Sequence, residues 1–242
     1  MDRDYPPIRG FLESTLLDWG GRIASEVFLP QCNLRCPFCH AGHLVTNDGE
    51  LESIPVDAVT GVLDRHRGWI DGVVISGGEP TVHESLPDLI DEFRRHGAKI
   101  KLDTNGTRPD VLERLTADGM LDAIAMDIKA PLDERYFAAS GARPELDRIR
   151  RSIDLIIGSG LEYEFRTTVC RRFHGLEDIL DIAESIAGAE TYILQAFQPG
   201  RCLAPDLNAV EPYSRDELRR FADVARSFVE RCFLRGDRMA PR

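Results

Sequence analysis

Three cysteines lie within eight residues of one another, at Cys32, Cys36 and Cys39. Thiolates at this C-x3-C-x2-C spacing are typical metal ligands, and two kinds of site fit them. A structural zinc site needs four ligands, and His40 or His43 could supply the fourth. A [4Fe–4S] cluster on three thiolates would instead leave one iron with an open position, as catalytic metals require. The three cysteines alone fit both a zinc-stabilised binding module and a reactive site.

The composition limits the class of protein to which these cysteines belong. The chain has 242 residues, a formal net charge of −11 and a pI of about 5.1. This acidic balance argues against nucleic acid as the main partner. No apolar run approaches the roughly 20 residues of a membrane span, and the first residues lack the basic start of a signal peptide. Because the other three cysteines are scattered, we expect a cytoplasmic protein without a disulfide framework.

Apolar runs that predict strands alternate with helical patterns along the chain. The predicted strands are 23–29, 71–78, 98–106, 121–129, 161–169 and 189–197. The predicted helices are 56–66, 86–97, 175–188 and 214–234. This alternation predicts parallel βα units in an α/β fold, either a partial barrel or an open doubly wound sheet. We expect a single domain over 1–242, with its core at about 20–200 and the last helix packed on it.

Helical spacing of apolar residues predicts which faces of three helices are buried. In the helix at 86–97 these residues are Leu86, Leu89, Ile90 and Phe93. In the helix at 175–188 they are Leu176, Ile179, Leu180, Ala183 and Ile186. In the last helix they are Leu218, Phe221, Ala225, Phe228 and Cys232. Ser214 and Glu217 form a capping box that marks where the last helix begins.

Polar and glycine residues gather where the predicted strands end. They are Ser76, Gly77, Gly78, Glu79, Asp103, Thr104, Asn105, Asp127, Lys129, Gln195 and Gln198, with Arg166 inside the fifth strand. Exposed loops alone account for one or two polar strand ends, but not for acids, cations and thiols together. Because parallel βα folds build their sites at the carboxyl ends of the strands, we expect these side chains to line one functional rim.

A glycine-rich motif, ISGGEPT, follows the second predicted strand at 75–81. Together with the cysteine motif, in which Phe38 precedes the last cysteine, it resembles the radical S-adenosylmethionine (radical SAM) enzymes. The resemblance implies a partial (β/α)6 barrel with a [4Fe–4S] cluster, whose open iron binds S-adenosyl-L-methionine. It also implies reductive cleavage of that cofactor to a 5′-deoxyadenosyl radical, which abstracts hydrogen from the substrate. A zinc site does not account for the second motif.

Further stretches resemble glycyl-radical-enzyme activases, and most closely the activating proteins of anaerobic ribonucleoside-triphosphate reductase. They are LDTNG (102–106), AMDIKAPL (125–132), YEFRTTV (163–169) and YILQAFQP (192–199). This resemblance implies a glycyl radical enzyme as protein substrate and a flavodoxin- or ferredoxin-type reductant. Ala41 departs from the asparagine common in activases, and Gln198 departs from a histidine of the pyruvate formate-lyase activase, which argues against that particular substrate. The alternative is a radical SAM enzyme that acts on a small molecule, in the manner of a deazaguanine synthase.

The resemblance assigns roles to residues beyond the cluster cysteines. The aromatic residues would lie near adenine, the glycines and acids near the methionine amino group, and the cations against carboxylate or ribose oxygens. Cofactor binding is thus implied for Phe38, His40, Gly77, Gly78, Glu79, Asp103, Lys129 and Arg166. A Na⁺ or K⁺ site is implied for Asp103, Thr104 and Asp127.

The remaining histidines and cysteines are predicted to stand outside the site. His43, His83, His96 and His174 are predicted to be surface residues. Cys170, Cys202 and Cys232 do not repeat the C-x2-C spacing, so we expect no auxiliary cluster. Of these, Cys232 is predicted on the buried face of the last helix, and the other two in loops as free thiols.

Overall fold

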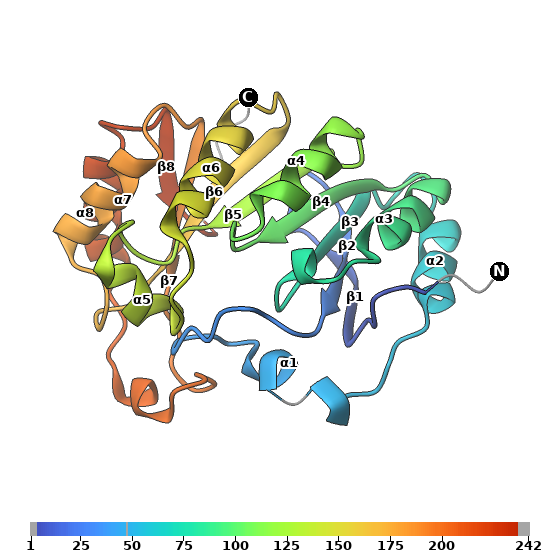
Figure 1. Cartoon of the computed structure of the whole chain (residues 1–242), viewed down its shortest axis with the longest axis horizontal. Helices are drawn as coiled ribbons and strands as arrows, with labels where there is room; N and C mark the ends of the chain where they lie inside the picture. The colour runs from blue at the N-terminus through green and yellow to red at the C-terminus, as the bar shows by residue number, and fades with distance from the viewer. Residues whose placement is uncertain (1–3, 47, 237–242) are drawn as a thin grey trace. The chain divides into compact units, whose positions relative to one another are not determined.

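The computed structural model describes residues 4–46 and 48–236, and Figure 1 shows the chain as a cartoon. The chain divides into two compact units. The first comprises Met1–Asn33, His43–Thr104 and Asp110–Ile124, and the second comprises Leu34–Gly42, Asn105–Pro109 and Ala125–Arg242. The cysteine motif is therefore shared, because Cys32 belongs to the first unit and the other two cysteines to the second.

The first unit is built on four strands that follow one another in chain order. They are β1 (Gly10–Thr15), β2 (Ala24–Leu29), β3 (Gly72–Gly77) and β4 (Lys99–Thr104). β1 pairs antiparallel with β2, whereas β2, β3 and β4 pair in parallel. The first four residues of β2 and of β3 are all buried, as parallel strands covered on both faces require. The sequence pattern predicted β2, β3 and β4 but not β1.

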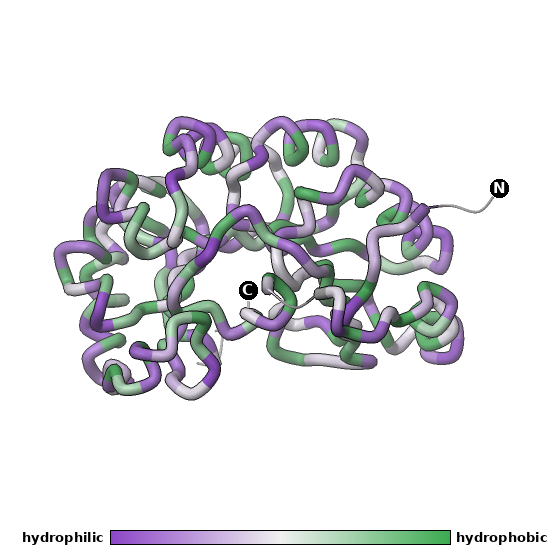
Figure 2. Tube along the Cα trace, turned by 60° about the horizontal axis from the view of Figure 1, so that its bottom comes forward, coloured by the Kyte–Doolittle hydropathy of each residue, from purple (hydrophilic) through white to green (hydrophobic). Residues whose placement is uncertain are grey.

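Four helices follow the first strands along the chain. They are α1 (Gly42–Thr46), α2 (Val56–Arg65), α3 (Leu86–Arg95) and α4 (Pro109–Ala117), with short 3-10 turns at Asp48–Glu50 and Pro80–Val82. Of these, α2 contacts β1 and α3 contacts β4. Hydrophilic and hydrophobic stretches alternate along the helices (Figure 2). All four apolar residues predicted on the inner face of α3 are fully buried, which contributes about 2 kcal/mol for each side chain.

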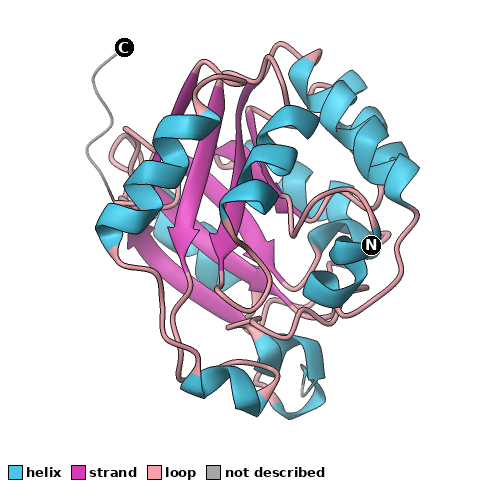
Figure 3. Cartoon of the chain, turned by 90° about the vertical axis from the view of Figure 1, so that its left-hand side faces the viewer, coloured by secondary structure: helices cyan, strands magenta, loops and turns pink. Residues whose placement is uncertain are grey.

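The second unit continues the alternation of strands and helices. Its strands are β5 (Ala123–Asp127, whose first two residues belong to the first unit), β6 (Glu162–Val169), β7 (Thr191–Ala196) and β8 (Arg231–Leu234). Its helices are α5 (Glu134–Ser140), α6 (Leu146–Ile157), α7 (Leu176–Ser185) and α8 (Arg215–Ala225), with a 3-10 turn at Pro205–Ala209. β6, β7 and β8 pair in parallel, and helices lie beside these strands (Figure 3). The predicted α/β class with parallel strands is confirmed.

The structure corrects the predicted end of the last helix. α8 has the predicted capping box at Ser214 and Glu217, but it ends at Ala225 and not near Leu234. Arg231–Leu234 forms β8, which pairs with β7 and alternates half-buried with buried residues. Cys232 is buried as predicted, but on a strand. Helical spacing continued to fit these residues by chance, whereas pairing with β7 decides their conformation.

The inner face of α7 differs from its prediction in part. Ile179 and Ala183 are buried as predicted, together with Ile182. Leu176, predicted to face inward, is 43% exposed, and Leu180 is half-buried. Leu176 is the first residue of α7, and helical spacing is a poor guide to burial at a helix end, where the regular geometry stops. Within the described residues, no helix combines the length and apolar character needed to cross a membrane.

The turn after β3 passes directly against the backbone that leads from β2 to Cys32. The Gly78 N–H donates to the Leu29 carbonyl at 2.8 Å, and the Glu79 N–H donates to the Gln31 carbonyl at 2.7 Å. A Cβ on Gly78 would lie 1.8 Å from the Gln31 carbonyl oxygen, which leaves no room for any side chain. Glycine is therefore required here by the chain's own backbone. Its role against the methionine amino group stays a prediction.

Gly78→Ala should displace the backbone before Cys32 and lower the free energy of unfolding by about 3 kcal/mol, measured by chemical denaturation. Gly61→Ala is the matched control, because Gly61 lies inside α2 and a Cβ there meets nothing within 4 Å. The control should leave stability unchanged or raise it by up to about 1 kcal/mol. A Gly78→Ala protein as stable as the control would contradict the close backbone contact.

Candidate active site

Backbone contacts within the first unit fix the segment just before Cys32. Gln31 adopts a left-handed conformation with φ of 65°, and its N–H donates to the Leu44 carbonyl at 3.0 Å. The Nε2 atom of His83 lies 2.8 Å from the Pro30 carbonyl oxygen. Cys32 is half-buried. Its thiol is therefore presented from a constrained turn at the carboxyl end of β2, where parallel βα folds place functional groups.

Cys36 and Cys39 lie on a tight turn in the second unit, packed against the end of α5. The Cys39 N–H donates to the Cys36 carbonyl at 3.0 Å, and the Arg35 N–H donates to the Ser140 carbonyl at 2.9 Å. A Cβ on Gly141, whose φ is +61°, would lie 2.0 Å from the Arg35 carbonyl oxygen. Glycine at this position therefore allows the cysteine turn to lie directly on the helix end.

The loop after β7 holds the same cysteine turn through a second backbone contact. The Ala204 N–H donates to the Pro37 carbonyl at 2.9 Å. A Cβ on Gly42 would lie 3.3 Å from Cδ1 of Leu203, so this loop packs closely at both ends of the turn. The hydrogen bond joins two backbone groups, so it uses none of the side chains of the turn.

The two thiols of this turn interact with a cation. Burial raises the pKa of the Cys39 thiol, whereas the Lys129 ammonium and the Ala41 N–H favour its thiolate form. Lys129 also interacts electrostatically with Cys36. Within the described residues, no three His, Cys, Asp or Glu side chains are gathered into a metal site. Ligand geometry and metal binding form together, so the evidence for ligation is the chemistry and spacing of these thiols.

A carboxylate bridges two cations at the ends of β5 and β6. Lys129 Nζ donates to Asp127 Oδ2 at 2.8 Å, and Arg166 Nε donates to Asp127 Oδ1 at 2.8 Å. The side chains are 29% exposed for Asp127, 16% for Lys129 and 8% for Arg166. Charges this far removed from water need partners, and Asp127 supplies one to both cations.

The charges of this network are fixed at neutral pH. Burial acts to raise the pKa of Asp127, but the charges of Arg166 and Lys129 outweigh it and hold that pKa well below its usual range. Burial acts to lower the pKa of Lys129, and the charge of Asp127 outweighs it and raises that pKa. The second unit therefore presents an oriented ammonium and guanidinium, which are suitable donors to a carboxylate or a ribose oxygen.

In the first unit, Glu79 ties the end of β3 to the end of β4. Its Oε1 accepts from the Thr81 N–H at 3.1 Å and from the Thr104 hydroxyl at 2.8 Å, and also from the Thr81 hydroxyl. Asp103 accepts from the Ser76 hydroxyl at 3.4 Å. Glu79, Asp103 and Thr104 are all buried. These contacts hold the two strand ends together, and a cofactor contact of Glu79 or Asp103 stays a prediction.

The two aromatic residues predicted near the adenine differ in burial. Phe38 is buried, with its ring centroid 5.7 Å from that of Phe173 and 6.3 Å from that of His174. His40 is exposed and meets Phe197 edge-on, with centroids 6.4 Å apart. Phe38 therefore has packing that fixes its ring, whereas His40 is available to a ligand.

The predicted site residues fall into two groups. The first unit holds Cys32, Gly77, Gly78, Glu79, Asp103 and Thr104. The second holds Cys36, Phe38, Cys39, His40, Asp127, Lys129 and Arg166. In the second group, Lys129 and Arg166 both contact the Asp127 carboxylate. The predicted monovalent-cation ligands are divided between the units, so that cation site stays a prediction.

The structure corrects the prediction for one of the four histidines, His174. It is buried at 1% exposure, although it was predicted to be a surface residue. His43 is exposed, and His83 and His96 are half-buried with hydrogen-bond partners. A lone histidine carries no spacing pattern, but His174 does follow β6 at a strand end, where the sequence pattern places functional groups. That position was the signal available for it.

The cysteines outside the motif are all unpaired thiols in the described residues. Cys170 lies just after β6 and is completely buried, so the predicted loop position is confirmed but its thiol is inaccessible. Burial raises the pKa of the Cys170 thiol. Cys202 is half-buried, and its N–H lies 3.4 Å from Asn208 Oδ1.

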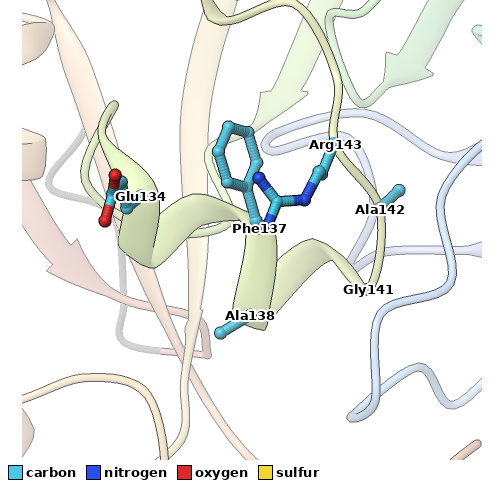
Figure 4. Close-up of a pocket in the computed structure, with 6 residues that line it drawn as sticks. All are labelled: Glu134, Phe137, Ala138, Gly141, Ala142 and Arg143. Carbon is cyan, nitrogen blue, oxygen red and sulfur yellow. The ribbon is translucent and has the colours of Figure 1, made fainter.

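A pocket of about 520 Å³ lies over α5 and the turn that follows it. Its lining residues are Glu134, Phe137, Ala138, Gly141, Ala142 and Arg143 (Figure 4). The Arg143 guanidinium carbon lies 5.0 Å from the centroid of the Phe137 ring. Because Gly141 also supports the cysteine turn, the pocket and that turn share one structural element.

The chain matches a known family and known proteins. The model of the Radical SAM superfamily matches residues 27–186. A Methanocaldococcus jannaschii protein, proposed to be a glycyl-radical enzyme activating enzyme, is 28% identical over 94% of this chain and 95% of that protein. A Methanococcus aeolicus protein, proposed to be a GTP 3′,8-cyclase, is 29% identical over 63% of this chain and 52% of that protein.

Solved structures resemble the fold. Streptococcus suis SuiB bound to S-adenosylmethionine superposes with a TM-score of 0.65 at 16% identity. The likeness covers 85% of this chain and 48% of SuiB, so the chain spans about half the length of that protein. At this identity the likeness concerns the fold alone, and it confirms the expected radical SAM type of architecture.

Asp127→Asn should leave Lys129 and Arg166 without their shared counter-charge and lower the free energy of unfolding at pH 7 by about 3 kcal/mol. Because the folded-state pKa of Asp127 is lowered, its stabilisation is present above about pH 4 and is lost as pH falls further. The difference between wild type and variant should therefore shrink on acidification, as measured by urea denaturation from pH 7 to pH 3.

Asp147→Asn is the control for this experiment. Asp147 also pairs with an arginine, Arg150, but its side chain is 96% exposed. An exposed pair of this kind contributes under about 1 kcal/mol, so the control should remain close to wild type at every pH. If Asp127→Asn behaved like this control, the buried network would not be a major source of stability.

Proposed function

Because the chain belongs to the Radical SAM superfamily, we propose that it is a glycyl-radical-enzyme activase of the cytoplasm. Its protein substrate would be an anaerobic ribonucleotide reductase or another glycyl radical enzyme, from which it removes one hydrogen atom of a backbone glycine. A flavodoxin- or ferredoxin-type protein would supply the electron.

One observation carries the choice of an activase over other radical SAM functions. The likeness to the proposed activating enzyme runs through 94% of this chain and 95% of that protein. The likeness to the proposed cyclase covers only 52% of that protein, so almost half of its length has no counterpart in the match. An activity that needs the whole of a protein is better supported by a relative that matches over its whole length.

The thiol chemistry of the chain fits the cofactor that the family implies. Three thiols at C-x3-C-x2-C spacing suit an iron–sulfur cluster, and Cys36 and Cys39 lie on a turn whose neighbouring Lys129 favours thiolates. When bound, the [4Fe–4S] cluster supplies the electron that cleaves S-adenosyl-L-methionine and so initiates hydrogen abstraction. We assign Cys32, Cys36 and Cys39 as its ligands.

The other site residues would bind and orient S-adenosyl-L-methionine. Lys129 and Arg166 are the donors for its carboxylate or ribose oxygens, because Asp127 holds both cations charged and aligned. Phe38 and His40 would contact its adenine. Gly77, Gly78, Glu79 and Asp103 would line its methionine end. Asp103, Thr104 and Asp127 remain candidates for a Na⁺ or K⁺ site.

Cys36→Ala should abolish reductive cleavage of S-adenosyl-L-methionine and lower the iron content below the roughly four irons per chain expected of the anaerobically reconstituted wild type. Iron analysis and chromatography of the cleavage products measure the two effects. Cys232→Ala is the control, because Cys232 lies on β8 outside the motif, and it should retain both iron and cleavage. One zinc per chain in place of iron would overturn the cluster assignment.

Incubation of the reconstituted enzyme with its reductase, a reductant and S-adenosyl-L-methionine should give the EPR doublet of a glycyl radical. The same mixture with the target glycine of the reductase changed to alanine should give no doublet. If cofactor cleavage is normal but no glycyl radical enzyme of the organism gives a doublet, the activase role is wrong. A small molecule would then be the substrate.

A further inference from the structure

His174 is held by two hydrogen bonds that determine which ring nitrogen carries the proton. The Cys170 N–H donates to Nδ1 at 3.0 Å, and Nε2 lies 2.8 Å from the Lys129 carbonyl oxygen. A backbone N–H can only donate, so Nδ1 must present its lone pair. The proton then belongs on Nε2, where the Lys129 carbonyl accepts it. Both contacts are satisfied at once by the neutral Nε2–H tautomer.

The surroundings keep the ring neutral and in place. Burial lowers the pKa of His174, against smaller opposing effects from the Lys129 carbonyl, Asp178 and the Cys170 backbone. The carbonyl of His174 accepts a hydrogen bond from the Tyr213 hydroxyl at 2.7 Å, which anchors its backbone as well. The ring thus has one protonation state and one orientation.

The ring joins the ends of two adjacent segments that carry predicted cofactor residues. Cys170 follows β6 and Lys129 follows β5. Ile128 is already bonded to β6, because its N–H donates to the Arg166 carbonyl at 2.8 Å and its carbonyl accepts from the Thr167 hydroxyl at 2.9 Å. Lys129 lies one residue beyond these bonds. Its backbone interacts with the Tyr136 hydroxyl, and His174 supplies the hydrogen bond to its carbonyl.

The same ring also contacts an aromatic residue predicted near the cofactor. The centroids of His174 and Phe38 lie 6.3 Å apart with the rings edge-on at 67°. Phe38 lies between Pro37 and Cys39 in the cysteine turn. One buried imidazole therefore touches both the backbone of Lys129 and the segment that carries two predicted cluster ligands.

We propose that His174 is a positioning residue for S-adenosyl-L-methionine binding, acting as its Nε2–H tautomer to fix the Lys129 backbone and so aim the Lys129 ammonium. The proposal rests on the role assigned to Lys129 under the proposed function. It does not depend on whether the substrate is a protein or a small molecule.

Two amide substitutions separate the two contacts of the ring. The terminal amide of glutamine reaches the position of Nε2, so His174→Gln can still donate to the Lys129 carbonyl. The shorter asparagine reaches the position of Nδ1, so His174→Asn can still accept from the Cys170 N–H but leaves the Lys129 carbonyl without its donor. If His174 only stabilised the fold, loss of either contact would affect cofactor binding equally, and the two variants would behave alike.

The binding test measures the Kd of S-adenosyl-L-methionine by calorimetry on reconstituted, unreduced protein. His174→Asn should raise the Kd about tenfold, whereas His174→Gln should raise it less than threefold. Adding His174→Asn to Lys129→Met should weaken binding no further than Lys129→Met alone. Wild-type Kd values for both His174 variants, or equal weakening by both, would overturn the proposal. A wild-type Kd for Lys129→Met would refute the role of Lys129 itself.

A second measurement needs neither cluster nor cofactor. Nitrogen-15 NMR of the metal-free wild-type protein, with His174 signals assigned by their loss in His174→Gln, should show a neutral ring protonated at Nε2 at pH 7. A ring protonated at Nδ1, or at both nitrogens, would overturn the proposal. If the variants fail to fold, through-bond correlation of the ring to the His174 backbone signals of the wild-type protein gives the same assignment. If the protein is not an activase, the Kd values and the protonation state of His174 would be unchanged. Only the EPR doublet of the glycyl radical would be missing.

Discussion

The bridge from Lys129 through the Asp127 carboxylate to Arg166 is the interaction on which the second unit's part of the site depends. Two cations at 16% and 8% side-chain exposure are costly to bury without counter-charges. The Asp127 carboxylate pairs with both, and Glu164 Oε1 lies 3.7 Å from Arg166 Nη1 as a further partner. The bridge also aligns donors for an anionic or polar ligand and brings a positive charge to bear on the thiols of Cys36 and Cys39. Stability and the proposed binding of S-adenosyl-L-methionine would therefore depend on the same three side chains.

Backbone hydrogen bonds hold the segments that carry the three cysteines. The cysteine turn is held by Ser140 and Ala204, and the backbone before Cys32 is held by the turn at Gly78. The backbone of each cysteine segment is therefore held without the use of its thiols. Support of this kind is what a precise site requires.

The sequence was informative where a pattern had one physical cause. Apolar runs predicted the strands from β2 to β7, because a strand buried on both faces needs apolar side chains at nearly every position. The same logic failed at Cys232 and Leu234, since helical spacing and strand pairing both fit those residues and only contact with β7 decides. The candidate site residues were proposed from residue type and motif. The ion pairs of Lys129 and Arg166 with Asp127, and the burial of His174, depend instead on contacts between distant segments. No local pattern records such contacts.

The central claim is that the hydrogen atom removed by this enzyme comes from a glycine of a partner protein. Its most direct test is to prepare the partner reductase with deuterated glycine, carry out the reaction, and analyse the 5′-deoxyadenosine by mass spectrometry. We expect deuterium in that product, and none when the target glycine of the partner is replaced by alanine. Unlabelled 5′-deoxyadenosine, formed at the same rate with either partner, would contradict the claim.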